Sequence, residues 1–334
     1  MSRGLGDVYK RQVANYGAWT QAYALNKILS KMFPEDKIEH VAYLEESHWN
    51  SYYLNDDKGR NCFQYNWNEI PHSKELTADD IDSYDCDLLI TGSDSIWEEI
   101  NSGVFNSDWH LVGLGFKNCP KIISYAASSG SITKNDKLSD QMRIGLNKYD
   151  SISVRDKNTW EVVKLLTDRK ASIVLDPSLL WDFRNDENIK KPSYNRYIAV
   201  YGCQWNEEFI KNARKFADEN DYKLISIGFI NQWCDINYKR LELRAFEWLG
   251  MIKYADYVFT STFHGLMLSL AFRRQLKFCQ VDYVKNRSQT LIDSLKLADN
   301  IYTFETRIDY EEVDDKLETM RKDSVNWLRE AIVN

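Results

Sequence analysis

The sequence of 334 residues lacks an apolar run of the roughly 18 residues that a membrane-spanning helix needs, and it has no apolar segment of the signal-peptide kind. It also lacks a basic excess, because 43 Lys and Arg residues stand against 50 Asp and Glu residues and give a net charge of −7. Proteins that bind nucleic acid generally present a basic field, so this class is disfavoured. We expect a cytoplasmic protein with at most peripheral contact with a membrane.

The motifs of common cofactor and metal sites are absent as well. The sequence has no G-x-G-x-x-G, P-loop, G-x-S-x-G or H-E-x-x-H pattern, and its five histidines show no metal-ligand spacing with cysteine or with one another. The six cysteines are dispersed, without a C-x-x-C pair, and four of them lie in apolar runs. We therefore predict reduced cysteines in the core rather than a disulfide framework, and no metal site.

The composition is typical of a globular protein with an ample core. Hydrophobic residues make up 43% of the chain and charged residues 28%. At roughly 150 residues per domain, the length indicates about two domains. Aromatic residues make up 13%, and the Trp and Tyr side chains between positions 49 and 67 fit packing better than a sugar-binding platform.

Hydrophobic periodicity predicts alternating strands and helices. A helix begins at Gly17, has its apolar residues on one face, and ends before Pro34. The other elements predicted in the first half are strands at 38–44, 86–91, 121–127, 151–154 and 172–175, and helices at 136–148 and 157–166. Those in the second half are strands at 197–202, 222–228, 256–260 and 276–280, and helices at 206–219, 245–254, 264–272 and 288–297. This alternation is typical of an α/β fold with parallel, doubly wound sheets.

The polar segment 183–196 lacks apolar periodicity and is interpreted as a linker between two domains. We predict an N-terminal Rossmann-like domain at residues 1–185 and a C-terminal one at residues 186–305. A long amphipathic helix is predicted within residues 306–334. The first twelve residues have neither strand nor helix pattern, so we expect the first strand of the N-terminal domain to be missing or replaced.

Polar residues follow the predicted strands, at the edge where open parallel sheets bind ligands. Two facing domains would bring these residues to one interdomain cleft. His264 also stands at the start of a predicted helix, where backbone N–H groups attract anions. The residues in question are Asn15, Asp94, Ser128, Arg155, Asp176 and His264.

Each of these residues also has a purely structural interpretation. Asn15 fits an N-cap of the first helix, as Asp94 and Asp156 fit caps of later helices. Asp176 precedes a proline and fits a turn better than a catalytic role. His264 can also be interpreted as a structural residue that is held by a hydrogen bond. Arg155 at a strand end needs a partner for its charge. The sequence leaves three partners open: a ligand, Asp156 or a carboxylate elsewhere in the chain.

Six motifs occur in order between about residues 13 and 300. They are Asn15-Tyr16-Gly17-Ala18 with Gln21 and Tyr23-Ala24-Leu25, Gly92-Ser93-Asp94-x-x-Trp97, Ser124-Tyr125-Ala126-Ala127-Ser128, Ser153-Val154-Arg155-Asp156, Leu175-Asp176-Pro177-Ser178-Leu179-Leu180, and Thr260-Ser261-Thr262-Phe263-His264-Gly265. Together they resemble the polysaccharide pyruvyl transferase family, and six motifs in order are far more specific than any one of them.

The resemblance implies two Rossmann-like domains arranged as in GT-B glycosyltransferases, with a C-terminal helix reaching back. It also implies transfer of a pyruvyl group from phosphoenolpyruvate to a sugar of a polysaccharide or its lipid-linked precursor. Two sugar hydroxyls become bridged as a pyruvate ketal, and phosphate is released. The family uses no nicotinamide, flavin or pyridoxal cofactor, so no cofactor is expected beside the donor substrate.

On this basis we predict His264, Arg155 and Asp94 as catalytic residues. His264 would act as a general acid, Arg155 would hold the donor carboxylate or phosphate, and Asp94 would orient or deprotonate the attacking hydroxyl. The N–H groups at positions 265 to 267 would add to the anion site. The residues expected to bind substrate are Asn15, Gly17, Gln21, Ser93, Ser128, Ser261, Thr262 and Gly265.

One departure from the family pattern concerns the donor. Many members have an arginine two residues before the histidine, where this chain has Thr262, although Ser or Thr stands there in a large branch. Two other functions stay open. A glycosyltransferase would use the same strand ends for a nucleotide sugar, and a catalytically silent binding protein would tolerate changes at Arg155 and His264.

Overall fold

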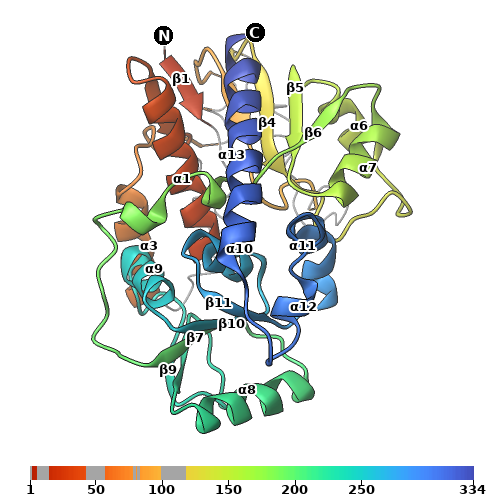
Figure 1. Cartoon of the computed structure of the whole chain (residues 1–334). Coiled ribbons are helices and arrows are strands. Elements are labelled where there is room, and N and C mark those ends of the chain that lie inside the picture. The colour runs from red at the N-terminus through yellow and green to blue at the C-terminus, as the bar shows by residue number, and fades with distance from the viewer. Residues whose placement is uncertain (1, 6–14, 43–56, 78–79, 81–82, 99–117) are drawn as a thin grey trace. The chain divides into compact units, whose positions relative to one another are not determined.

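The computed structural model describes residues 2–5, 15–42, 57–77, 80, 83–98 and 118–334 (Figure 1). The chain divides into two compact units. Unit 1 comprises residues 1–54, 67–181 and 319–334, and unit 2 comprises residues 55–66 and 182–318.

Unit 1 contains a parallel sheet whose described strands run in the order β2-β1-β3-β4-β5-β6. The strands are β1 (Ser2–Leu5), β2 (Lys37–His40), β3 (Leu89–Thr91), β4 (Ile122–Ala127), β5 (Ser151–Val154) and β6 (Ala171–Ile173). The helices and turns between them are α1 (Tyr16–Met32), α6 (Asp140–Leu146), α7 (Lys157–Leu166) and the 3-10 turn η2 (Pro177–Leu179). Strands β3 and β4 are buried along their whole length, as expected for parallel strands covered on both faces.

Unit 2 contains a second parallel sheet, in the order β11-β10-β7-β8-β9. Its strands are β7 (Tyr197–Tyr201), β8 (Lys223–Ile227), β9 (Ile236–Tyr238), β10 (Tyr257–Thr260) and β11 (Gln275–Phe278). Its helices are α8 (Glu207–Glu219), α9 (Ala245–Lys253), α10 (Phe263–Ala271), α11 (Asp282–Leu295) and α12 (Ala298–Ile301), with the 3-10 turn η3 (Phe183–Asn185). Helices α3 (Asp57–Asn68) and α13 (Tyr310–Val333) each contribute residues to both units.

The strand order reverses once in each sheet. In unit 1 the chain moves from β1 outward to β2 and then returns to the other side of β1 at β3. In unit 2 it moves from β7 through β8 to β9 and returns to the other side of β7 at β10. Such a switch point opens a crevice beyond the carboxyl ends of the two strands that flank it. The ends of β3 and β10 are therefore the positions at which a ligand site is expected in each sheet.

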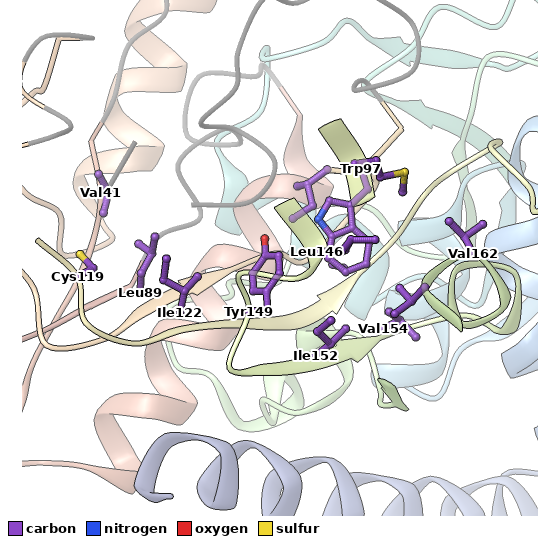
Figure 2. Close-up of a cluster of buried hydrophobic side chains, with 14 of the residues drawn as sticks. Val41, Leu89, Trp97, Cys119, Ile122, Leu146, Tyr149, Ile152, Val154 and Val162 are labelled. Atoms are coloured by element: carbon purple, nitrogen blue, oxygen red, sulfur yellow. The ribbon is translucent and has the colours of Figure 1, made fainter. Parts of the chain in front are cut away.

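Each unit has its own hydrophobic core. In unit 1, side chains from β3, β4, β5 and α7 pack with Trp97 and Tyr149, whose ring centroids lie 6.0 Å apart (Figure 2). In unit 2, aromatic residues dominate, and Phe259 of β10 contacts both Phe209 and Phe216 of α8. These cores hold the strands, and so fix the positions of the residues that follow each strand.

The predicted C-terminal helix is confirmed as α13, the long blue helix of Figure 1. Its second half packs on unit 1. The Ser324 hydroxyl accepts a hydrogen bond from the Leu175 N–H at 2.9 Å, and Arg321 donates to the Leu179 carbonyl at 2.8 Å. The helix thereby holds the chain on both sides of Asp176.

The first strand, which we expected to be missing or replaced, is present among the described residues. Residues Ser2–Leu5 form β1, which pairs in parallel with β2 and with β3 and so lies inside the sheet. The sequence Ser-Arg-Gly-Leu has no apolar alternation, so nothing local marks it as a strand. Backbone pairing with two neighbours places it there.

The prediction that all cysteines are reduced is also wrong. Cys86 and Cys119 form a disulfide with a Cα–Cα distance of 5.1 Å. Each precedes one of two paired strands, β3 and β4, in which Leu89 lies opposite Ile122. Sheet pairing, which sequence spacing does not reveal, brings the two thiols together. The remaining cysteines, Cys62, Cys203, Cys234 and Cys279, are free thiols.

Several boundaries differ from the prediction. Helix α11 begins at Asp282 rather than at residue 288, α6 begins at Asp140 rather than at 136, and β9 and α12 were not predicted. Residues 55–66 belong to unit 2 instead of the N-terminal domain. They do so because Asn66 accepts a hydrogen bond from the first N–H of α9, at Ala245, and Cys62 donates to the Leu243 carbonyl.

Candidate active site

The turn after β3 carries Gly92, Ser93 and Asp94 at the switch point of unit 1. Gly92 has a φ of 102°, and a Cβ there would overlap the Tyr125 carbonyl, so the position requires glycine. Asp94 itself has a φ of 72°, in the left-handed region that few residues other than glycine and asparagine adopt readily. Its carbonyl accepts a hydrogen bond from the Ser128 N–H at 2.7 Å, which ties this turn to the end of β4.

Arg155, at the end of β5, lies between two carboxylates. One terminal nitrogen is 2.8 Å from Asp94 Oδ1, and the other is 3.1 Å from Asp176 Oδ2. The Arg155 and Asp176 side chains are each 1% exposed and the Asp94 side chain 8%. One guanidinium thus pairs with both carboxylates. Buried charges are stable only when they are paired and hydrogen-bonded in this manner.

Gln21 of α1 extends this group at its other end. Its Nε2 donates to Asp176 Oδ2 at 2.5 Å, and Asp176 Oδ1 accepts from the Ser178 N–H and hydroxyl at the start of η2. Both carboxylate oxygens of Asp176 therefore accept hydrogen bonds within the protein. Gln21, Asp176, Arg155 and Asp94 form a continuous chain of contacts, which we call the Arg155 cluster.

Two side-chain oxygens next to the Arg155 cluster have no hydrogen-bond partner anywhere in the described part of the chain. They are Oε1 of Gln21, whose amide nitrogen is already used by Asp176, and the hydroxyl oxygen of Ser93, next to Asp94. Both residues are 1% exposed. A buried polar atom without a partner costs free energy, and such atoms in native proteins commonly await a ligand or water.

Tyr125 of β4 supports the cluster from inside the sheet. Its hydroxyl donates to the Leu175 carbonyl at 3.0 Å. Burial, together with the negative charge of Asp176, raises the pKa of Tyr125 well above its usual value, so the phenol stays protonated and keeps donating. The backbone before Asp176 is thus held by Tyr125 and, through the Leu175 N–H, by Ser324.

The other residues predicted in unit 1 have structural roles. Asn15 caps α1, accepting from the Gly17 N–H at 2.8 Å, and Gly17 lies buried in the first turn of that helix. The Ser128 hydroxyl donates to Asp156 at 2.6 Å, and Asp156 caps α7 through the Thr159 N–H. Ser128 therefore supports a helix start, and the capping interpretation of Asn15 and Asp156 is confirmed.

In unit 2, Thr262 caps α10. Its hydroxyl accepts from the Gly265 N–H at 3.0 Å and contacts the Thr260 hydroxyl at 3.0 Å. Gly265 packs so closely on the end of β10 that a Cβ would overlap the Thr260 hydroxyl. The expected contribution of the 265 to 267 N–H groups to an anion site is wrong in part, because Gly265 donates to the cap and Leu266 to the Thr262 carbonyl.

His264 occupies the first turn of α10 and is 7% exposed. Ser261, 4% exposed, precedes the cap at the end of β10, and its N–H donates to the Tyr201 carbonyl at the end of β7. His264 and Ser261 therefore lie at the switch point of the second sheet, beside the positive end of the helix dipole.

The structure thus brings the predicted residues together in two sets. Gln21, Ser93, Asp94 and Arg155 meet in unit 1, and Ser261, Thr262, His264 and Gly265 meet in unit 2. Asp176 was interpreted as a turn residue, yet it is the centre of the first set. The signal in the sequence that could have identified Asp176 as a site residue is its position directly after a predicted strand. The meeting of both sets in one cleft stays a prediction.

The described residues lack two kinds of feature. They contain no group of three or more His, Cys, Asp or Glu side chains placed to hold a metal ion. They also contain no helix with the length and apolar character needed to cross a membrane.

Comparisons with known proteins agree with the fold. A family model described as polysaccharide pyruvyl transferase matches residues 15–276. A Listeria monocytogenes structure with the provisional name UDP-N-acetylglucosamine 2-epimerase is similar, with 9% identity, a TM-score of 0.55, and 99% of this chain and 96% of that chain covered. UDP-GlcNAc 2-epimerase from Methanocaldococcus jannaschii gives 10% identity, a TM-score of 0.54, and coverage of 96% and 92%. No protein with a curated description matches the sequence.

Identities this low show the fold alone. They confirm the predicted fold class, two Rossmann-like parallel-sheet domains of the GT-B-like kind.

Proposed function

The chain belongs to the polysaccharide pyruvyl transferase family, and from that premise we propose that it transfers a pyruvyl group from phosphoenolpyruvate to a sugar. The acceptor belongs to a polysaccharide or its lipid-linked precursor, and the products are a pyruvate ketal and phosphate. The match over residues 15–276 carries the proposal. The placement of polar residues at the switch point of each sheet supports it.

In this proposal His264 is the general acid. It lies in the first turn of α10, where the helix dipole favours a negatively charged ligand, and the Thr262 cap fixes that turn. Phosphoenolpyruvate is an anion and the protein carries a net charge of −7, so a local positive element is needed. His264 donates its proton to the methylene carbon, which makes C2 of the donor electrophilic.

Asp94 is the proposed base. It accepts the proton of the first sugar hydroxyl as that oxygen bonds to C2. The bond from C2 to the phosphate oxygen then breaks, and phosphate leaves with the electron pair and takes the proton held by Asp94. The second hydroxyl bonds to C2, and its proton passes to His264, which regains the proton that it gave to the methylene carbon. Arg155 holds Asp94 and Asp176 through its two terminal nitrogens, and its further N–H groups are proposed to hold the donor carboxylate or phosphate.

The alternative is a glycosyltransferase that uses a nucleotide sugar. The observation in its favour is that Thr262, which stands where many family members have arginine, is committed to the α10 cap and adds no cation. Ligand-induced thermal stabilisation separates the two functions. Phosphoenolpyruvate raises the melting temperature under the first, and UDP or GDP raises it under the second.

The test of the proposed function is phosphate release from phosphoenolpyruvate, measured against a panel of nitrophenyl and lipid-linked sugars. His264→Gln is expected to lower the rate with the best acceptor about 10²–10⁴-fold, the usual effect of losing a general acid. The matched control is His72→Gln, which changes a histidine of unit 1 whose ring contacts the Ile70 carbonyl. Equal rates for the two variants would overturn the role of His264, and stabilisation by UDP alone would overturn the choice of donor.

A further inference from the structure

Asn231 lies in unit 2 between β8 and β9, and its side chain is a buried hydrogen-bonding centre with 5% exposure. Its amide nitrogen donates to the Gly202 carbonyl at 2.9 Å and to the Ser226 hydroxyl at 2.8 Å. Its amide oxygen accepts from the Trp205 indole N–H at 2.9 Å. The carbonyl can only accept and the indole N–H can only donate, so these two partners determine which end of the amide faces each of them. A single side chain thereby joins the segment after β7 to β8.

The segment that Asn231 holds packs against the end of β10. A Cβ at Gly202 would overlap the Ser261 hydroxyl and lie 3.1 Å from the Ser261 nitrogen, so the two backbones touch. The Ser261 N–H also donates to the carbonyl of Tyr201, the residue before Gly202, at 3.3 Å. Ser261 stands three residues before His264, which lies in the first turn of α10. A change in the position of Gly202 is therefore passed to the start of the turn that carries His264.

Trp205 connects the same segment to α8. Its ring stacks on Phe209 with centroids 5.2 Å apart, and it meets the Trp233 ring at nearly a right angle at 5.3 Å. Ring packing of this kind tolerates small displacements, because the hydrophobic effect has no preferred direction. Hydrogen bonds weaken steeply when their length or angle changes. The Asn231 amide, rather than the ring packing, therefore determines the exact position of the Gly202 carbonyl.

We propose that Asn231 is a positioning residue for the part of the donor site that unit 2 supplies. It holds the segment 202–206 against Ser261, and thereby holds Ser261 and His264 in place for phosphoenolpyruvate. This inference rests on the proposed function for the identity of the donor, and on the Asn231 hydrogen bonds for the positioning. Asn231 acts through Gly202 and Ser261 and needs no contact with the substrate. A displacement of about 1 Å caused by a change away from the reacting groups can cost about 100-fold in rate.

Asn231→Leu keeps most of the side-chain volume and removes all three hydrogen bonds of the amide. In the phosphate-release assay we expect the KM for phosphoenolpyruvate to rise about tenfold or more, while the KM for the sugar acceptor stays within about twofold of the wild type. The matched control is Asn300→Leu, which removes an amide hydrogen bond to the Arg307 carbonyl in the same unit and should change neither KM. Equal changes in the two variants, or equal changes of both KM values in Asn231→Leu, would indicate a general loss of structure and overturn the proposal.

A milder variant keeps the test decisive if Asn231→Leu does not fold. Trp205→Phe removes the indole N–H and keeps an aromatic ring that can stack on Phe209. It should raise the KM for phosphoenolpyruvate in the same direction by a smaller factor, about threefold. The control is Trp160→Phe in unit 1, where the indole N–H that is lost donates to the Ala171 carbonyl at 3.0 Å. The same KM for phosphoenolpyruvate in Trp205→Phe and Trp160→Phe would contradict the assignment.

Amide hydrogen exchange of the ligand-free protein distinguishes failure of the proposed reaction from failure of this inference. If phosphoenolpyruvate supports no phosphate release, peptides that cover residues 202–206 and 261–265 still report the positioning. In Asn231→Leu both segments should exchange about tenfold faster than in the wild type, and in Asn300→Leu neither should change. Trp205→Phe should show the same pattern with a smaller increase. Faster exchange at 202–206 alone, or at neither segment, would overturn the connection between Asn231 and His264 whatever the reaction is.

Discussion

At the scale of single residues, Arg155 is the group on which the first site depends. Its two terminal nitrogens contact the carboxylates of Asp94 and Asp176, which would otherwise repel each other inside unit 1. A buried ion pair contributes little to the free energy of unfolding while both partners are present. Removing one partner is costly, because it leaves an uncompensated charge in a buried place.

Replacing Arg155 by methionine is therefore expected to lower the free energy of unfolding by about 3–5 kcal/mol. Urea unfolding followed by circular dichroism measures the change. The control is Arg143→Met, which breaks an ion pair with Asp140 whose side chains are 53% and 85% exposed, and it should cost less than about 1 kcal/mol. Adding Asp94→Asn and Asp176→Asn to Arg155→Met should recover part of the loss. Similar costs for the two single variants would show that the buried charges are not coupled.

Local sequence patterns single out the residues of the candidate site, but they do not identify the side chains with which those residues pair. Asp94, Arg155 and His264 were found because each follows a strand, and that position depends on local pattern. The pairing of Arg155 with Asp176 depends on where β5 and the β6 end lie in the folded sheet, which no local pattern contains. Asp-Pro favours a turn in the sequence, and in the structure Asp176 is both a turn residue and the partner of Arg155.

At the scale of elements, strands with strong apolar patterns were predicted well. Ser151–Val154 was predicted residue for residue, and β4 and β10 to within one residue at either end. Elements that are stabilised mainly by neighbouring strands were not predicted. Strand β9 is three residues long and half-buried, and β1 has no alternation. Such segments become strands because a neighbouring strand offers hydrogen-bond partners.

Lys277 of β11 gives a prediction at this scale. It is 1% exposed, and its ammonium donates to the Asn300 carbonyl at 2.8 Å and to the Thr306 carbonyl at 2.6 Å, which fixes α12 and the segment after it. Burial lowers the pKa of Lys277 to about 8 from an ordinary value near 10.5, against a weaker opposing effect of Glu305. Above pH 8 the folded protein therefore loses this proton while the unfolded chain still holds it.

Since the unfolded state then binds more protons, the contribution of Lys277 to stability rises with pH between about 8 and 10.5. Relative to Lys277→Met, the wild type should gain about 2 kcal/mol of unfolding free energy between pH 7.5 and 9.5. Measuring the difference between the two proteins cancels the titration of cysteines and tyrosines. Lys223→Met, at the exposed start of β8, should show no such pH dependence. A flat difference for Lys277→Met would mean that the lysine titrates normally.

At the scale of the whole molecule, two sheets with the same design each have polar residues at a switch point. The alternation of strands and helices predicted this architecture, and the family resemblance predicted its GT-B-like kind. Neither predicted the disulfide. The thiols of Cys86 and Cys119 are 33 residues apart, and only the pairing of β3 with β4 shows that they are neighbours.

That disulfide closes a loop containing β3 and the turn with Ser93 and Asp94, so it restrains the unfolded chain around the first site. For a loop of this length the entropic contribution is about 3–4 kcal/mol. Replacing both Cys86 and Cys119 by serine should lower the free energy of unfolding by up to that amount, whereas Cys203→Ser, at an exposed free thiol, should not change it. Protein unfolded without reductant should show four reactive thiols, and six after reduction. Six thiols before reduction would show instead that the cysteines are reduced, as their spacing predicts, and that the turn with Asp94 is held by the Ser128 hydrogen bond and the Arg155 ion pair without a disulfide.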